Sequence, residues 1–154
     1  MKTNEKVLDL LNDLIQINND RIAGYGKAAH EVTPEDADLK DLFKRYARES
    51  SDYVQEISSE IISLGGRAVR STTVSGKIYR VWMDMKSSMS NEERQTALES
   101  CEFGEDAAQK AYQKALESDF ELPTGIRNMI SKQKASLKKA HNEIKKRRDA
   151  YAHA

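Results

Sequence analysis

Apolar residues recur along most of the chain at the three- and four-residue spacing of an amphipathic helix. This pattern predicts four long helices, over about residues 4–31, 34–64, 91–118 and 123–151. Between the second and third of these, a shorter amphipathic stretch predicts one short helix over about residues 76–89. We therefore expect an all-α protein.

Breaks in the apolar pattern coincide with residues that start or stop helices. Thr33 suits an N-cap and Pro34 a first helical position, so the second long helix should begin there. Gly65, followed by a second glycine, suits the C-cap of the same helix. Ser90 with Glu93 has the form of a capping box at the start of the third long helix.

The lengths of the connections indicate how the helices are arranged. The first two long helices are joined by a few residues, as are the last two, so each pair should form an antiparallel hairpin. Residues 66–90, between the hairpins, are enough chain to run the length of a bundle. Two hairpins with one long central crossover form the ferritin-like arrangement. We predict a single domain over residues 1–154, a ferritin-like four-helix bundle whose crossover carries the short fifth helix.

Composition agrees with this fold and excludes several classes of protein. Charged residues make up 32% of the 154 residues and aromatic residues 6%, with only 7 Gly and 2 Pro, which is typical of a helical protein with one core. The formal net charge is zero, so the whole molecule has no general attraction to nucleic acid or to anionic lipid.

A single cysteine, Cys101, excludes an intramolecular disulfide and is compatible with a reducing compartment. No apolar run approaches the roughly 20 residues that cross a bilayer, so we expect a cytoplasmic protein.

Charge is nevertheless unevenly distributed along the second half of the chain. Residues 91–121 are mainly acidic and residues 127–148 mainly basic. This favours two neighbouring helices of complementary charge, because cations near a helix C-terminus also stabilise it without any ligand. A basic arm for nucleic acid is the alternative, and the neutral overall charge argues against it.

Four polar residues interrupt the apolar stripes, each near the middle of a different long helix. They are Asn18, Glu49, Glu105 and His141. In a four-helix bundle, groups at mid-height of different helices meet in one layer, and such a layer is either a metal site or the remnant of one.

A two-metal carboxylate site uses one Glu from each of two helices and a Glu-x-x-His pair from each of the other two. This chain has Asp52 where a histidine would follow Glu49, and Lys138 where a glutamate would precede His141. Both pairs are therefore broken. The remaining candidate ligands for iron or manganese are Glu49, Glu105 and His141, with Glu102 and Asp20 assisting.

The same carboxylates have a structural interpretation. A buried carboxylate needs a partner, and Arg21, Arg45, Arg48 and His141 lie on adjacent turns. An ion pair or hydrogen bond between these groups would fix the register of the helices without any metal.

Short stretches of this chain resemble a bacterial ferritin-like four-helix-bundle family known only as a domain of unknown function. The resemblance spans nearly the whole chain and rests on residues 11–15, 64–66, 82–86, 102–106 and 148–150, together with several single positions. These single positions are Asp20, Gly24, Tyr25, Ala28, Ala29, Ala111, Tyr112, Ala140 and His141. The resemblance implies a ferritin-like fold with a connection to stress or metal physiology, and it implies no activity.

Our leading hypothesis from the sequence is a non-enzymatic bundle protein with a structural or stress-associated role, no required cofactor, and a degenerate metal-site layer. We expect it to form homodimers and to bind neither membranes nor nucleic acid. The alternative is an iron- or manganese-binding protein with oxidase, peroxidase or iron-handling activity. The sequence has no nucleophile motif and no glycine-rich phosphate loop that would indicate other chemistry.

Overall fold

The computed structural model describes residues 2–73 and 91–152, and the side chains of residues 4–73 and 94–150. Within these ranges the chain forms four long α-helices and one short 3-10 helix. They are α1 (Lys2–Glu31), η1 (Pro34–Asp36), α2 (Ala37–Ser63), α4 (Asn91–Leu116) and α5 (Thr124–Ala152). The short helix and the capping box expected over residues 76–93 lie outside the part whose side chains are described.

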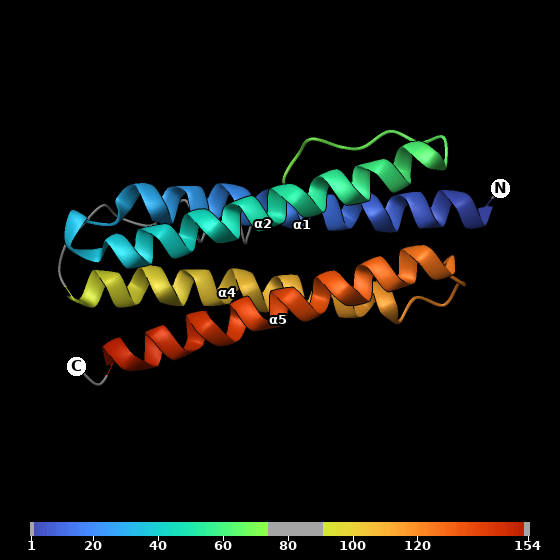
Figure 1. Ribbon diagram of the computed structural model, residues 1–154. Helices are drawn as coiled ribbons and strands as arrows, with labels where there is room; N and C mark the ends of the chain where they lie inside the picture. Colours follow the sequence, from blue (N-terminus) through green and yellow to red (C-terminus); the bar gives the residue numbers. More distant parts are fainter. Residues whose placement is uncertain (1, 74–90, 153–154) are drawn as a thin grey trace.

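The four long helices form a bundle of two stacked antiparallel hairpins (Figure 1). One hairpin is α1 with α2 and the other is α4 with α5; α1 packs against α4, and α2 against α5. The C-terminal end of α2 and the N-terminal end of α4 lie at opposite ends of the bundle (Figure 1). The predicted all-α bundle with a long central crossover is confirmed. None of the described helices is long and apolar enough to cross a lipid bilayer.

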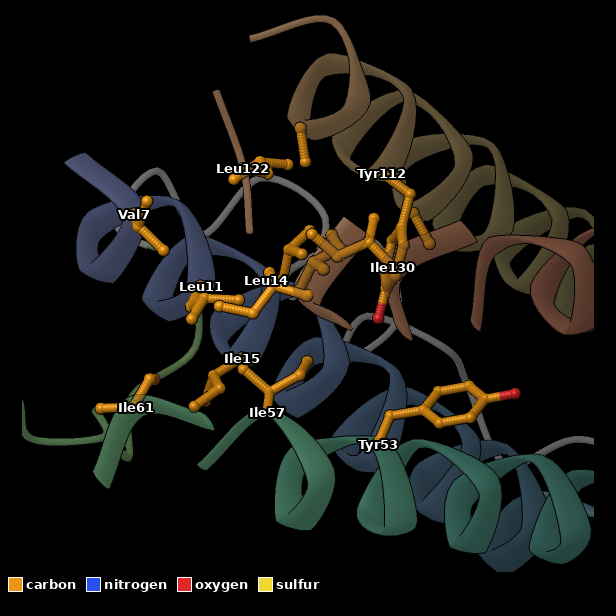
Figure 2. Packing of buried hydrophobic residues seen from close by; sticks show 14 of the residues in the cluster. Val7, Leu11, Leu14, Ile15, Tyr53, Ile57, Ile61, Tyr112, Leu122 and Ile130 are labelled. Carbon is orange, nitrogen blue, oxygen red and sulfur yellow. The ribbon is translucent and has the colours of Figure 1, made fainter. Parts of the chain in front are cut away.

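Buried apolar side chains form two clusters, one toward each end of the bundle. The first cluster takes α1 residues up to Ile17 and α2 residues from Tyr53 onward. In Figure 2, Ile15 of α1 points toward Ile57 of α2, within this cluster. The second cluster takes α1 residues from Tyr25 onward and the first half of α2. On α1, α2 and α4 a gap separates the two clusters, and polar side chains fill that level of the bundle.

The turn between α1 and α2 differs from the expected cap. Pro34 begins a single 3-10 turn, in which the Asp36 amide donates to the Thr33 carbonyl at 3.0 Å, and α2 itself begins at Ala37. Thr33 is the N-cap residue of this 3-10 turn, but its side chain makes no capping hydrogen bond, and the N-cap residue of α2 is Asp36. The Asp36 carboxylate instead accepts from Arg94 of α4, at 3.0 and 2.9 Å. This ion pair ties the start of the second hairpin to the turn of the first.

The end of α2 is a Schellman motif, as the paired glycines predicted. The Gly66 amide donates to the Ile61 carbonyl at 2.9 Å, and the Gly65 amide donates to the Ile62 carbonyl at 3.0 Å. Gly65 has φ of 81°, in the left-handed region that a side chain disfavours. The motif satisfies carbonyls that the last turn of the helix leaves open.

The crossover begins by running back along α1, held by amide side chains of that helix. Asn12 donates to the Arg67 carbonyl at 3.1 Å and accepts from the Val69 amide at 2.9 Å. Two turns further, Asn19 donates to the Ser71 carbonyl at 2.9 Å. These polar residues of α1 therefore fix the direction in which the chain leaves the first hairpin.

Two glycine-to-alanine substitutions should have opposite effects. Gly65→Ala should lower the free energy of unfolding by about 1–2 kcal/mol, because an alanine there is strained at positive φ. Gly26→Ala should raise it by up to about 1 kcal/mol, since Gly26 is an exposed position inside α1 with no neighbour within 4 Å of an added Cβ. Urea denaturation of both variants tests this, and an equal effect of the two would contradict the Schellman assignment.

Candidate functional site

The centre of the bundle, between the two apolar clusters, contains a fully buried arginine. Arg21 projects from α1 together with Asn18 and Tyr25, at the spacing of one helix face, and all three are 0% exposed. Ile22 would also continue the apolar spacing of Leu11 and Ile15, but Ile22 is only partly buried. The side of α1 that faces the other helices is therefore the side that carries the arginine.

Arg21 forms a two-point ion pair with Glu105 of α4. Its Nε donates to Glu105 Oε1 at 2.9 Å and its Nη2 donates to Oε2 at 2.8 Å. Both side chains are 0% exposed. The Tyr25 hydroxyl also donates to Oε2, at 2.6 Å, so the Glu105 carboxylate accepts three hydrogen bonds. Parallel, charge-assisted bonds of this kind are among the strongest available to side chains.

The other end of the guanidinium contacts α2. Nη1 of Arg21 donates to the Ser50 hydroxyl and, at 3.3 Å, to Glu49 Oε1. The Glu49 side chain is 26% exposed and lies at the edge of the buried group. One cation thus faces two carboxylates, Glu49 and Glu105.

This charge balance is reflected in the pKa values of the charged groups. Burial raises the pKa of Glu49 and the Glu105 carboxylate raises it further, although Arg21 lowers it. Burial alone would lower the pKa of Arg21, but the Glu105 carboxylate raises it above its ordinary value, so the guanidinium is always charged.

Neutral side chains extend the network to the fourth helix. The Ser50 hydroxyl donates to Asn18 Oδ1 at 2.9 Å, and Asn18 Nδ2 donates to the Tyr112 hydroxyl at 2.8 Å. The Tyr112 hydroxyl donates to Gln133 Oε1 of α5 at 2.6 Å. Burial raises the pKa of Tyr112, which keeps this phenol a neutral donor. We call these connected side chains the polar layer: Asn18, Arg21, Tyr25, Glu49, Ser50, Glu105, Tyr112 and Gln133.

A two-metal carboxylate centre does not fit the polar layer. Such a centre needs carboxylates from all four helices and two histidines around open positions for the metals. Here the described residues of the layer supply two carboxylates and no histidine, and the α1 and α5 positions carry amides, Asn18 and Gln133. The guanidinium of Arg21 already lies between Glu49 and Glu105 and supplies the positive charge.

The five expected ligands are divided among three places. Glu49 and Glu105 meet in the polar layer, where they both contact Arg21. Asp20 faces the crossover instead, and accepts from the backbone amide and the hydroxyl of Thr73 at 3.1 and 2.7 Å. His141 lies outside the layer, and its Nε2 pairs with Asp106 Oδ1.

His141, Glu102 and Asp106 form a second group, on the surface where α4 meets α5. One ligand atom from each of the three lies within 4.8 Å of the others, a carboxylate–histidine arrangement that could hold a metal ion. Glu102 also pairs with Arg148 of α5. Sequence reasoning named Glu102 and His141 but missed Asp106, although its spacing of four residues from Glu102 places both on one helix face.

The ion pair should show strong energetic coupling. Arg21→Met should cost about 3–5 kcal/mol, because it leaves the Glu105 carboxylate buried without its cation. Arg21→Met combined with Glu105→Gln should cost less than the sum of the two single changes, by about 0.5–3 kcal/mol. Denaturant unfolding at pH 7 measures this cycle, with Arg48→Met on the exposed face of α2 as the control. Additive costs would show that the two charges do not depend on each other.

Glu49 should make stability depend on pH. Because its pKa is raised in the fold, the folded state binds its proton more readily than the unfolded state does. Ionisation of Glu49 therefore opposes folding. The contribution of Glu49 to the free energy of unfolding falls as pH rises from 4.5, the ordinary pKa of a glutamate, through the raised pKa of the folded state.

Glu49→Gln should thus raise the melting temperature relative to wild type at pH 7, with a smaller difference at pH 4. The exposed Glu56→Gln on the same helix should give no such trend. A melting temperature lowered at pH 7 by Glu49→Gln would mean that attraction to Arg21 outweighs burial.

Comparison with known proteins identifies a family for the sequence and similar folds for the structure. The family described as "Domain of unknown function (DUF2383)" matches residues 6–118. A Dps1 variant from Mycobacterium smegmatis superposes with a TM-score of 0.78 at 17% identity, over 95% of this chain and 97% of that one. A dodecameric thioferritin from Bacteroides fragilis, a bacterioferritin-related protein, superposes with a TM-score of 0.75 at 17% identity, over 97% and 88% of the two chains. No protein of curated function is significantly similar in sequence.

These neighbours confirm the ferritin-like four-helix bundle. The expectation of a homodimer is wrong by comparison with these neighbours, because the Bacteroides fragilis protein is a dodecamer rather than a dimer. The family match covers most of the chain and agrees with the resemblance noted in its sequence. The chain therefore belongs to the DUF2383 family of domains of unknown function and has a ferritin-like fold.

Proposed function

We propose that this protein is a non-enzymatic ferritin-like bundle with a structural or stress-associated role, in which Arg21 supplies the positive charge that metal ions supply in a two-metal carboxylate layer. The polar layer then serves to fix the four helices in one register. The observation that carries this proposal is the two-point ion pair between Arg21 and Glu105, both fully buried.

The charges of the layer support a structural role over a redox role. A divalent cation entering beside Glu49 and Glu105 would meet a permanent positive charge at hydrogen-bond distance from both carboxylates. The Glu105 oxygens already accept three hydrogen bonds. Displacing the guanidinium would leave it buried without its carboxylate partners, which costs several kcal/mol. Metal chemistry at this level of the bundle is therefore unfavourable.

The hydrogen-bond pattern supports the same role. Each of the four helices contributes a side chain to one connected network, and a sliding or rotation of any helix would break at least one buried bond. Buried polar networks specify a unique arrangement when their members are satisfied, and among the described residues of this layer only Gln133 Nε2 is buried without a hydrogen-bond partner. Apolar clusters alone would be more tolerant of shifts between helices.

A second candidate function is iron or manganese binding, with oxidase, peroxidase or iron-handling activity. The group Glu102, Asp106 and His141 favours it, since it combines an imidazole with two carboxylates outside the polar layer. This candidate does not involve Arg21, so the two functions can be tested separately.

Iron oxidation distinguishes a structural layer from a catalytic one. Protein exposed to Fe(II) without oxygen and then mixed with air should oxidise iron no faster than buffer does, because the layer offers no open metal position. Glu49→Gln should leave both the bound iron and the rate unchanged. Oxidation that is faster than in buffer and is abolished by Glu49→Gln would overturn the proposal, whereas iron lost only in His141→Asn would point to the α4–α5 surface.

A further inference from the structure

We propose that Glu102, Asp106 and His141 form a binding site for a divalent first-row transition metal on the α4–α5 surface, and that Arg148 competes with the metal for Glu102. The site goes beyond the function proposed for the polar layer and does not depend on it. It deepens the second candidate function by naming the class of metal and a competing group.

The geometry brings the three ligands close to a metal-binding arrangement. Glu102 and Asp106 are four residues apart on α4 and share one face, while His141 comes from the antiparallel neighbour α5. One ligand atom from each lies within 4.8 Å of the others. Oxygen and nitrogen ligands at about 2.0–2.2 Å from one metal ion lie roughly 3–4 Å from one another. Small side-chain rotations would therefore bring all three into contact with one ion.

The helices that carry the ligands are firmly held. Leu98, Ala108, Leu137 and Ile144 flank the ligands on α4 and α5, and all four are 0% exposed. Gln109 of α4 also donates to the Lys134 carbonyl of α5 at 3.2 Å. Because the backbone is fixed by this packing, a metal would need to order only the ligand side chains.

Access and coordination are favourable on the solvent side. The Asp106 side chain is 51% exposed and that of His141 20% exposed, so an ion can approach from solvent and keep water as its remaining ligands. Glu102 is less exposed and lies on the inner side of the group. Three protein ligands plus water is the arrangement of an open site rather than of a closed structural one.

Arg148 occupies part of the space that a metal would use. It pairs with Glu102 Oε2 through Nη1, and with Asp149 Oδ1 through Nη2 at 2.8 Å. A metal bound to Glu102 would displace the first contact but leave the second, so the guanidinium would keep a carboxylate partner. The ion pair thus weakens metal binding without preventing it.

The ligand set selects the class of metal. One imidazole with two carboxylates suits borderline ions such as Zn²⁺, Co²⁺ and Fe²⁺, and it also accommodates Mn²⁺, which is harder. Mg²⁺ and Ca²⁺ prefer oxygen ligands alone, and Cu⁺ prefers sulfur, which none of the three residues supplies. Glu105, adjacent to Asp106 in sequence, points into the polar layer and is unavailable to this site.

Titration calorimetry of the full chain with Zn²⁺ tests the site, and Co²⁺ titration gives a visible spectrum that reports the ligand set. Wild type should bind about one ion per chain. His141→Asn and Asp106→Asn should each weaken binding by about tenfold or more. His30→Asn and Asp41→Asn, which remove the same groups from exposed positions of α1 and α2, should leave it unchanged.

Arg148→Gln provides the sharper test. It should tighten Zn²⁺ binding roughly two- to fivefold, because that factor corresponds to the free energy of one partly exposed ion pair. Lys146→Gln removes the same charge from an exposed position of α5 and should have a smaller effect. Circular dichroism would establish that each variant remains folded. Wild-type protein that binds no Zn²⁺, or that binds it as tightly in His141→Asn, would overturn the site and leave the assignment of Arg21 unaffected.

Discussion

The contact between Arg21 and Glu105 constrains the rest of the structure, because neither charge can be left alone in the interior. Taking an ion out of water costs several kcal/mol, and only close pairing with further hydrogen bonds offsets that cost. The two side chains meet this requirement with two parallel bonds and a third from Tyr25. The relative position of α1 and α4 is therefore fixed to within the tolerance of a hydrogen bond.

The other helices are positioned from this pair. Arg21 reaches α2 through Ser50, and the amide of Asn18 continues the chain of bonds to Tyr112. Apolar clusters then fill the bundle on either side of the layer. In the function we propose, the internal guanidinium takes the position of the metal ions in a two-metal carboxylate layer. An arginine carries a fixed charge on a covalent tether, so this layer is complete as soon as the chain has folded.

Neighbouring residues of α4 illustrate how one helix serves two environments. Each step along an α-helix turns the side chain by roughly 100°. Glu105 therefore faces the interior, while Asp106, the next residue, faces α5 and solvent beside His141. Complementary charge between α4 and α5, noted in the sequence, takes the form of specific contacts on this surface, including Glu102 with Arg148. The interior of the bundle and its α4–α5 surface are thus chemically separate.

The sequence by itself determined the helices, their approximate ends, the two hairpins and the long crossover, because apolar periodicity, glycine caps and loop lengths are local signals. It also located the level of the polar layer, through Asn18, Glu49 and Glu105. Only the tertiary structure decided that Arg21, rather than Ile22, turns inward and that His141 turns outward. Adjacent residues differ by about 100° around the helix, and a stripe in the sequence cannot resolve that angle until the neighbouring helices fix which side is buried.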